Sequence, residues 1–482
     1  MSVFPVVCQE NNAFPLGVGS AADGRRRLYL AVAATYAVTL STGLTCGYSS
    51  PALPDIRRTL NITEDDAAWF GSLVLPGGII VGLLSGQLLG LIGRRGTLIS
   101  AAAWFTSGWL CLAFGYSTPL LLAGRFLTGG GMAAASLAST VFVSEVAPAN
   151  LRGLLNTGCN FSLSLGLLLI YVLGKWLVYN WLAAACLVPA LISGAAFLFY
   201  VRESPQWLLQ KGRRKEAIAA MQFYRGPRIE NEFGALETAS ANVPGLSLAD
   251  VGQPYIYKPF LCSLLPLFMQ QASAINILIF YSQDVFEQAG ASMAPEDCTM
   301  IVGGVLTTIF LVATLLADRA GRKLLFVISS AVAVAGLVAL GLCFHYKEVH
   351  GQEFLANYGW LPLLSIAVYF TGYSLGLGPL PFVFVGELIP LRAKGIASGL
   401  CTASLYTFGF LATHWYTDLQ HALGTAGTYW MYASILAVAF VFFVLFVPET
   451  KGKSLEEIEQ LFGTVANPTQ LDKIDEVQTC HL

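Results

Sequence analysis

The chain has 482 residues, of which 55% are hydrophobic and only 12% are charged, and its formal net charge is −2. Its mean hydropathy of +0.63 excludes an ordinary soluble domain, because such domains carry about 25% charged residues. The near-neutral charge gives no indication of a nucleic-acid partner. The composition therefore predicts a protein whose helices lie in a lipid bilayer.

Apolar runs of about 20 residues recur along the chain, and each is long enough to cross a bilayer as a helix. Twelve are predicted, at 28–50, 69–91, 97–116, 119–143, 155–177, 181–201, 260–285, 300–317, 324–345, 360–385, 396–414 and 429–447. The buried helices of a large soluble protein would not confine the charged residues to the segments between the runs. We therefore expect an all-α membrane protein with twelve transmembrane helices.

The basic residues are distributed unevenly between the two sides of the predicted membrane. Arg25, Arg26 and Arg27 precede the first span. The short loops on that side carry Arg94, Arg95, Arg152, Arg319, Arg322, Lys323, Arg392 and Lys394, and those on the other side carry Arg57, Arg58, Lys175 and Lys347. This asymmetry places both termini in the cytosol. It also places the sequence "NIT" at Asn61 outside, as a glycosylation site. We expect a plasma-membrane location, with an internal membrane as the alternative.

No residue pattern indicates an enzyme or a metal centre. The ten cysteines are scattered and mostly within spans, without metal-ligand spacing, and the five histidines are too dispersed for a catalytic set. We therefore expect no cofactor and no metal. The sequence also implies no obligate protein partner, only the bilayer and a small-molecule substrate.

Three charged motifs occur twice, in the same order and six predicted spans apart. "GRRG" at 93–96 matches "DRAGRK" at 318–323, "SEVAPANLRG" at 144–153 matches "GELIPLRAKG" at 386–395, and "RESP" at 202–205 matches "PETKG" at 448–452. Such an internal repeat indicates two homologous six-helix bundles. The expected units are a tail at 1–24, bundles at 25–201 and 259–450, a cytoplasmic linker of short amphipathic helices at 202–258, and a tail at 451–482.

Two repeated bundles are typical of carriers that open alternately to the two sides of a membrane. Positive-inside topology explains the basic residues of the motifs but not their paired glutamates. Because exposed ion pairs contribute only about 0–1 kcal/mol each, a network of them suits a gate that opens repeatedly. The expected cytoplasmic gate consists of Arg94, Glu145, Arg152, Glu203, Asp318, Arg322, Glu387, Lys394 and Glu449.

Several further motifs carry a resemblance to a known family. They are "GYSSPALP" in the first span, "WFGS" at 69–72, "QQASAIN" at 270–276 and "GLGPLPFVFVGELIP" in the tenth span. With the repeated motifs, they make the sequence similar, over almost its whole length, to the sugar porter family of the major facilitator superfamily. The motifs "GYSSPALP", "WFGS" and "PLRAKGIASGL" resemble the branch that holds the intracellular-type glucose transporters and the arthropod trehalose transporters, which are facilitative. The resemblance implies the major facilitator fold and a sugar substrate.

Three amide side chains are the main candidates for a sugar site. Amides both donate and accept hydrogen bonds without charge, as a neutral polyhydroxylated ligand requires. On one continuous helix Gln270 and Asn276 would lie about 120° apart and line a broad wall, although amides at membrane depth can also join helices to one another. The resemblance implies that Gln270, Gln271 and Asn276 contact the sugar and that Tyr281 belongs to the outer gate.

The resemblance also places Asn160, Phe382 and Tyr406 at the sugar site, but the chain departs from the usual pattern there. Asn160 replaces a longer Gln, and Leu306 and Leu405 occupy positions that are polar in the family. The predicted site is therefore less polar than that of a glucose carrier, and the identity of the sugar stays open.

The resemblance separates passive from proton-coupled transport at one position. Proton-coupled members carry an Asp after the Gly-Tyr of the first span, whereas Gly47-Tyr48 is followed here by Ser49, which does not titrate. We expect passive uniport. The alternatives are a proton symporter that uses Asp284 or Glu287, and a sugar-sensing receptor, against which the short C-terminal tail argues.

Overall fold

The computed structural model describes residues 21–227, 229, 232–234, 236–237, 253–389 and 393–449, and the side chains of Asp318 and Lys394 lie outside the described set. The regular elements in these segments are helices. In chain order they are α1 (Ala21–Gly47), α2 (Ser49–Leu60), α3 (Glu64–Ser72), α4 (Val74–Leu91), α5 (Gly93–Ala113), α6 (Thr118–Val146), α7 (Ala149–Gly174), α8 (Tyr179–Phe199), α9 (Pro205–Gln210), α10 (Arg214–Arg225), α12 (Pro254–Ala272), α13 (Ile275–Phe280), α14 (Ser282–Ala289), α15 (Pro295–Ala320), α16 (Arg322–His350), α17 (Gln352–Tyr358), α18 (Leu361–Gly372), the π-helix η2 (Tyr373–Leu377), α19 (Leu380–Leu388), α20 (Lys394–His414) and α21 (Tyr416–Phe446).

Twelve stretches within these segments are long and apolar enough to cross a membrane, which confirms the predicted number of spans. Helices run past the apolar runs because their ends carry residues that reach water; α16, for example, extends from Arg322 to His350. The last span differs most from the prediction. It begins at Tyr416, and Gly424, with φ of 74°, interrupts the helix before its apolar part.

Some spans are not single helices. The second combines α3 and α4, the tenth contains the π-helix η2, and the seventh breaks between α12 and α13. The break in the seventh span is at Ala274, which has φ of 63°. Left-handed backbone is unusual for a residue with a Cβ atom. Interrupted helices at membrane depth occur where the backbone is buried in protein or lines a cavity.

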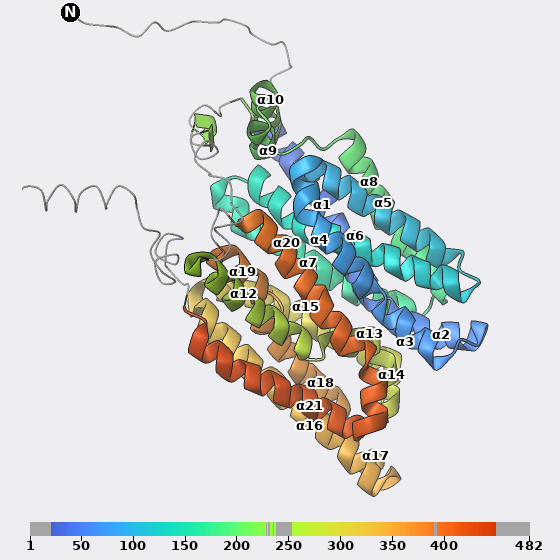
Figure 1. Cartoon of the computed structure of the whole chain (residues 1–482). Helices are drawn as coiled ribbons and strands as arrows, with labels where there is room; N and C mark the ends of the chain where they lie inside the picture. Colours follow the sequence, from blue (N-terminus) through green and yellow to red (C-terminus); the bar gives the residue numbers. More distant parts are fainter. Residues whose placement is uncertain are drawn as a thin grey trace, which may run out of the picture.

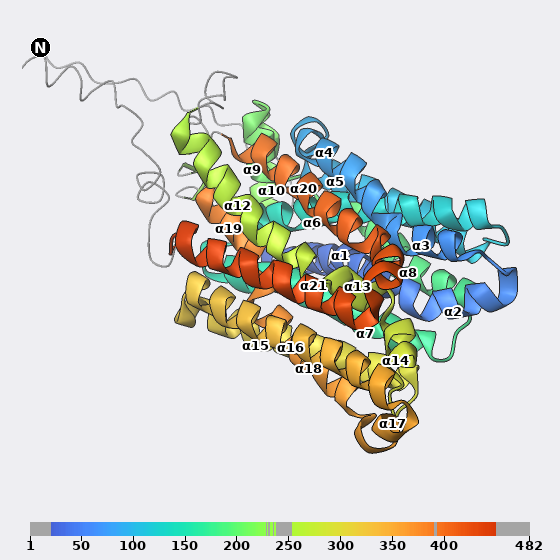
Figure 2. The same ribbon diagram turned by 60° about the horizontal axis from the view of Figure 1, so that its bottom comes forward.

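The spans form two bundles, one of α1 to α8 and one of α12 to α21, which lie side by side (Figures 1 and 2). Two seams join them, between α4 and α20 and between α7 and α15. These seams pair the second span with the eleventh and the fifth with the eighth. The internal repeat relates the second span to the eighth and the fifth span to the eleventh. It therefore converts one pair into the other, and the interface has approximate two-fold symmetry.

Two ends of the bundles are distinguished below. The linker face is the end at which α9 and α10 lie, and the far face is the end that carries α2, α14 and α17 (Figure 1). The guanidinium of Arg27, at the start of α1, lies 5.0 Å from the ring of Phe223 in α10, so the described chain begins at the linker face.

Candidate functional site

The three predicted amides come together at the break of the seventh span. Gln270 and Gln271 close α12, and Asn276 opens α13; the first two are buried. Nδ2 of Asn276 donates a hydrogen bond of 2.7 Å to Oε1 of Gln271. Nε2 of Gln270 donates one of 2.7 Å to the carbonyl oxygen of Gly378, which follows the π-helix in the tenth span. The side chain of Gln270 also interacts with that of Tyr373, in the π-helix of the tenth span.

The break corrects one expectation about these amides. A continuous helix would have separated Gln270 from Asn276 by about 120° around its axis. The α-helix instead ends at Ala272, and the left-handed backbone at Ala274 turns the chain before α13 begins. Asn276 therefore contacts Gln271 directly, whereas Gln270 bonds to the backbone of Gly378 in the tenth span.

Glycines of the facing helices leave room for the cluster and for a tyrosine beside it. A Cβ atom at Gly409 of α20 would lie 2.7 Å from Nδ2 of Asn276 and 2.8 Å from Oε1 of Gln271. A Cβ atom at Gly78 of α4 would lie 2.8 Å from the ring of Tyr406. Tyr406, which comes from the second bundle, is thus buried against the backbone of the first.

The structure places the remaining predicted site residues in different environments. Asn160 of α7 and Phe382 of α19 are exposed in the isolated chain, whereas Leu306 and Leu405 are buried and apolar. Among the described residues, the members of this set that are joined to each other by a hydrogen bond are Gln271 and Asn276.

The far face is closed by contacts between the two bundles. The hydroxyl of Tyr281 donates to the carbonyl oxygen of Ala68 at 3.4 Å, and that of Tyr171 donates to the carbonyl oxygen of Ile279 at 2.9 Å. A Cβ atom at Gly71 would lie only 2.1 Å from the Tyr281 hydroxyl. Tyr281, from the second bundle, therefore lies directly on the backbone of α3 in the first.

The charged motifs of the first bundle meet at the linker face. Nη2 of Arg94 lies 2.7 Å from Oε1 of Glu145, and the two side chains are only 11% and 7% exposed. The backbone N–H groups of Arg94 and Arg95 both donate to Oε1 of Glu203 at 3.0 Å. A carboxylate at a helix N-terminus satisfies N–H groups that have no partner within the helix, so Glu203 caps α5.

The second bundle repeats this arrangement with its own motif residues. Nε of Arg322 lies 3.4 Å from Oε1 of Glu387, with side chains 22% and 26% exposed. The backbone N–H of Lys323 donates to Oε2 of Glu449 at 3.2 Å. The sequence repeat is therefore also a repeat of contacts, since each bundle pairs its own arginine with its own glutamate.

These pairs lie within one bundle, whereas the sequence suggested a network across both. Arg152 is exposed and makes no ion pair with any described residue. The side chains of Asp318 and Lys394 lie outside the described residues. Sequence reasoning did not choose the partners, because five of the six motif copies contain both signs of charge. The pattern alone does not state which arginine meets which glutamate.

One buried cation was not recognised as a site residue from the sequence. Arg125 of α6 is fully buried, and its guanidinium donates to the carbonyl oxygens of Phe70 and Thr45 at 3.1 and 3.0 Å and to Oγ of Ser49 at 2.7 Å. The signal available was the motif "GR" at 124–125 inside an apolar run. A charge at that depth usually has a function or a partner.

Comparison with known proteins agrees with this architecture. Residues 24–462 match the family model described as "Sugar (and other) transporter". The chain is 34% identical over 435 residues to the facilitated trehalose transporter Tret1 of Culex quinquefasciatus, covering 88% of this chain and 83% of that protein. It is 33% identical over 464 residues to Tret1 of Aedes aegypti, covering 93% of this chain but only 57% of that protein.

Solved structures share the fold. The proton:xylose symporter XylE bound to 6-bromo-6-deoxy-D-glucose superposes with a TM-score of 0.74 at 24% identity, covering 91% of this chain and 99% of that one. The inward-open form of XylE from E. coli gives a TM-score of 0.75 at 23% identity, with coverages of 90% and 100%. These likenesses establish the major facilitator fold, and the relatives are transporters rather than enzymes. The chain therefore belongs to the sugar (and other) transporter family, as a multi-pass membrane protein of the sugar porter type.

Proposed function

We propose that this chain carries a sugar across a membrane by passive uniport, with the two bundles opening alternately on either side of the amide cluster. The observation that supports this most is the cluster itself. It combines the hydrogen-bonded pair of Gln271 and Asn276 with the buried amide of Gln270, at the break of the seventh span. Amides donate and accept hydrogen bonds without charge, as the hydroxyl groups of a neutral sugar require.

Trehalose is the first candidate substrate, because relatives that are 34% identical are named facilitated trehalose transporters; a hexose is the second. In this proposal Gln270, Gln271 and Asn276 bind sugar hydroxyls, and Tyr281 closes the far side of the site. Asn160, Phe382 and Tyr406 complete its walls. The glycine at 409 keeps α20 clear of the amides, so that the cluster can turn towards a ligand.

The surroundings of Arg125 support uniport rather than proton symport. A symporter needs a titratable group at membrane depth. The side chain that accepts from Arg125 in the first span is Ser49, which stays neutral at every physiological pH. The other acceptors of this guanidinium are backbone carbonyl oxygens, so no described carboxylate takes up a proton beside it.

We propose further that the linker face is cytosolic, as the basic residues indicate, and that the plasma membrane is the site of action. The bundles at 25–201 and 259–450 would move as units. The charge clusters around Glu145 and Glu387 belong to different bundles, and in this structure each pairs within its own bundle. They would come together, with Arg152, Asp318 and Lys394, to form the cytoplasmic gate when the linker face closes.

Uptake of labelled trehalose and glucose into liposomes that contain the purified chain tests this function. Uptake should be saturable, should equilibrate without exceeding the external concentration, and should not respond to a protonophore. Asn276→Ala should raise the half-saturation concentration by about twofold to about tenfold, because each lost hydrogen bond to a neutral ligand costs about 0.5–1.5 kcal/mol.

Ser263→Ala is the matched control. Ser263 is buried in the same helix as Gln270, but its hydroxyl bonds to the carbonyl oxygen of Pro259, one turn earlier. The Ser263→Ala variant should take up sugar with the same half-saturation concentration as the parent chain. Accumulation above the external concentration that a protonophore abolishes would contradict uniport, and equal affinities for sugar in Asn276→Ala and the parent would remove the cluster from the site.

A further inference from the structure

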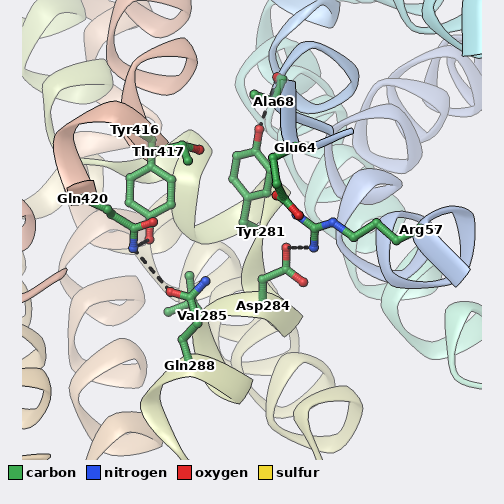
Figure 3. Close-up of a pocket in the computed structure, with 10 residues that line it drawn as sticks. All are labelled: Arg57, Glu64, Ala68, Tyr281, Asp284, Val285, Gln288, Tyr416, Thr417 and Gln420. Atoms are coloured by element: carbon green, nitrogen blue, oxygen red, sulfur yellow. Dashed lines mark hydrogen bonds and ion pairs between the residues drawn. The ribbon is translucent and has the colours of Figure 1, made fainter. Parts of the chain in front are cut away.

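An ion pair joins the two bundles at the far face. Nη1 of Arg57, in α2, lies 2.9 Å from Oδ2 of Asp284, in α14, and Nη2 of Arg57 lies 3.3 Å from Glu64 of α3. Figure 3 shows the Arg57 side chain reaching from the first bundle to the carboxylate of Asp284 in the second. This contact bridges the interface that must open when the far face opens.

The two partners differ in their access to water. The side chain of Asp284 is 14% exposed, that of Arg57 is 32% exposed and that of Glu64 is 78% exposed. Burial raises the pKa of Asp284, and the charge of Arg57 opposes this effect without cancelling it. When the far face closes, the carboxylate of Asp284 therefore loses water, and its negative charge becomes unfavourable.

The other charged and titratable groups near Asp284 do not replace Arg57. Glu287 of α14 and Glu64 of α3 add negative charge, and the phenol groups of Tyr281 and Tyr416 lie close by. On the neighbouring helices α15 and α16, Asp297 pairs with Lys175, and Lys347 donates to the carbonyl oxygen of Gln288. Among the described residues, the cation that contacts Asp284 is thus Arg57.

The surrounding pocket is too small for a second sugar site. Its volume is about 70 Å³, and it lies between Tyr281, Asp284, Gln288, Tyr416 and Gln420 (Figure 3). A space of this size holds a few water molecules, since one water needs about 10–15 Å³ of such volume. The pair therefore acts on the closing of the face rather than on binding of substrate within it.

We infer that Arg57 is the counter-ion that allows the outer gate to close over the buried carboxylate of Asp284. The inference rests on the proposed function only in that the bundles alternate; it does not depend on which sugar is carried. Removal of one partner of a buried pair leaves the other charge uncompensated and is strongly unfavourable, whereas removal of both is often neutral. Arg57 is thus a positioning residue, which acts on the closing of the gate through Asp284. When Arg57 is removed, replacing Asp284 with a neutral residue should restore closing.

The pH dependence of gate closing follows from the different hydration of Asp284 in the open and closed states. In the open state Asp284 is hydrated, so its pKa returns towards the ordinary value, whereas in the closed state it is raised. The closed state therefore binds a proton more strongly, and acidification favours closing. As the pH rises through the raised value, the proton leaves and the gate depends on Arg57. A variant without Arg57 should close in acid and open at neutral pH.

Thiol labelling of a buried reporter tests this inference without any sugar. Ser72 is fully buried, and its Oγ lies 3.3 Å from Nδ1 of His414 in the second bundle, so it becomes accessible only when the far face opens. Ser72→Cys is made in the parent chain, in Arg57→Gln, in Asp284→Asn and in the double variant. Each is labelled with a maleimide in lipid nanodiscs at about pH 7.5 and about pH 5.5.

At the higher pH, Arg57→Gln should be labelled about tenfold faster than the parent, because the carboxylate of Asp284, whose side chain is 14% exposed, has lost its counter-ion. Asp284→Asn and the double variant should be labelled like the parent. At the lower pH, the labelling rate of Arg57→Gln divided by that of the parent at the same pH should fall towards one. Comparing variants at one pH cancels the pH dependence of the thiol itself. Recovery in acid also shows that Arg57→Gln is folded.

Arg58→Gln is the matched control, since Arg58 is the exposed neighbour of Arg57 and makes no ion pair with any described residue. It should be labelled like the parent. Faster labelling of Asp284→Asn, or no recovery of Arg57→Gln by acid or by the second substitution, would overturn the inference. Normal labelling results with no sugar uptake would instead contradict the proposed substrate and leave the gate inference intact.

Discussion

A methyl group added at Gly409 should weaken sugar binding without touching the sugar. The new Cβ atom would lie 2.7 Å from Nδ2 of Asn276 and 2.8 Å from Oε1 of Gln271, the two atoms that form the 2.7 Å hydrogen bond of the amide pair. Contacts this short force something to move. Both atoms are the ends of side chains, so we expect the amides to rotate away while α20 stays in place.

The size of the effect follows from the bond that is lost. Displacing one hydrogen-bonding amide costs about 0.5–1.5 kcal/mol, which corresponds to about a twofold to tenfold rise in the half-saturation concentration of Gly409→Ala. Gly82→Ala separates this effect from the general gain in helix stability that Gly to Ala substitution brings. Gly82 lies on the same seam, but its added Cβ atom would be 3.5 Å from Thr402, an ordinary contact.

Initial rates of sugar uptake in liposomes, measured over a range of concentrations for both variants, provide the assay. The reasoning would be refuted if Gly409→Ala showed the half-saturation of the parent chain. It would also be refuted if Gly82→Ala lost affinity equally, because the seam as a whole, rather than the amide pair, would then be intolerant of the extra atom.

Two further predictions concern the linker face and the far face. Glu145→Gln should lower the free energy of unfolding by about 3–5 kcal/mol, because it breaks a pair that is almost fully buried. Glu387→Gln, at a more exposed pair with a 3.4 Å contact, should lower the free energy of unfolding by only about 0–1 kcal/mol. Thermal unfolding in detergent compares the two variants. Equal losses of stability would show that burial of the pair does not set the difference. Asn61, exposed at the C-terminal end of α2 on the far face, should carry a glycan, so Asn61→Gln should shift the chain to lower apparent mass on a gel. A parent chain that does not respond to glycosidase when made in a glycosylating cell would contradict the proposed orientation.

Sequence reasoning reached the site in part. The three amides could be chosen because their chemistry is rare within an apolar run, and the structure joins two of them by a hydrogen bond. Their arrangement could not be derived, because Ala274 gives no sign in the sequence that its backbone is left-handed. Gly409 was equally invisible, since the sequence of α20 does not state which of its residues faces the seventh span.

The sequence by itself determined the twelve spans, the internal repeat and the family. These properties follow from local composition, because a span needs only about 20 apolar residues, and a repeat needs only similar segments in the same order. The tertiary structure decided which charges meet. Arg94 pairs with Glu145 inside one bundle, whereas Arg57 reaches across to Asp284 in the other. Electrostatic partners are set by distances of a few ångströms between segments far apart in the chain, and only the packing of helices within and between the bundles fixes those distances.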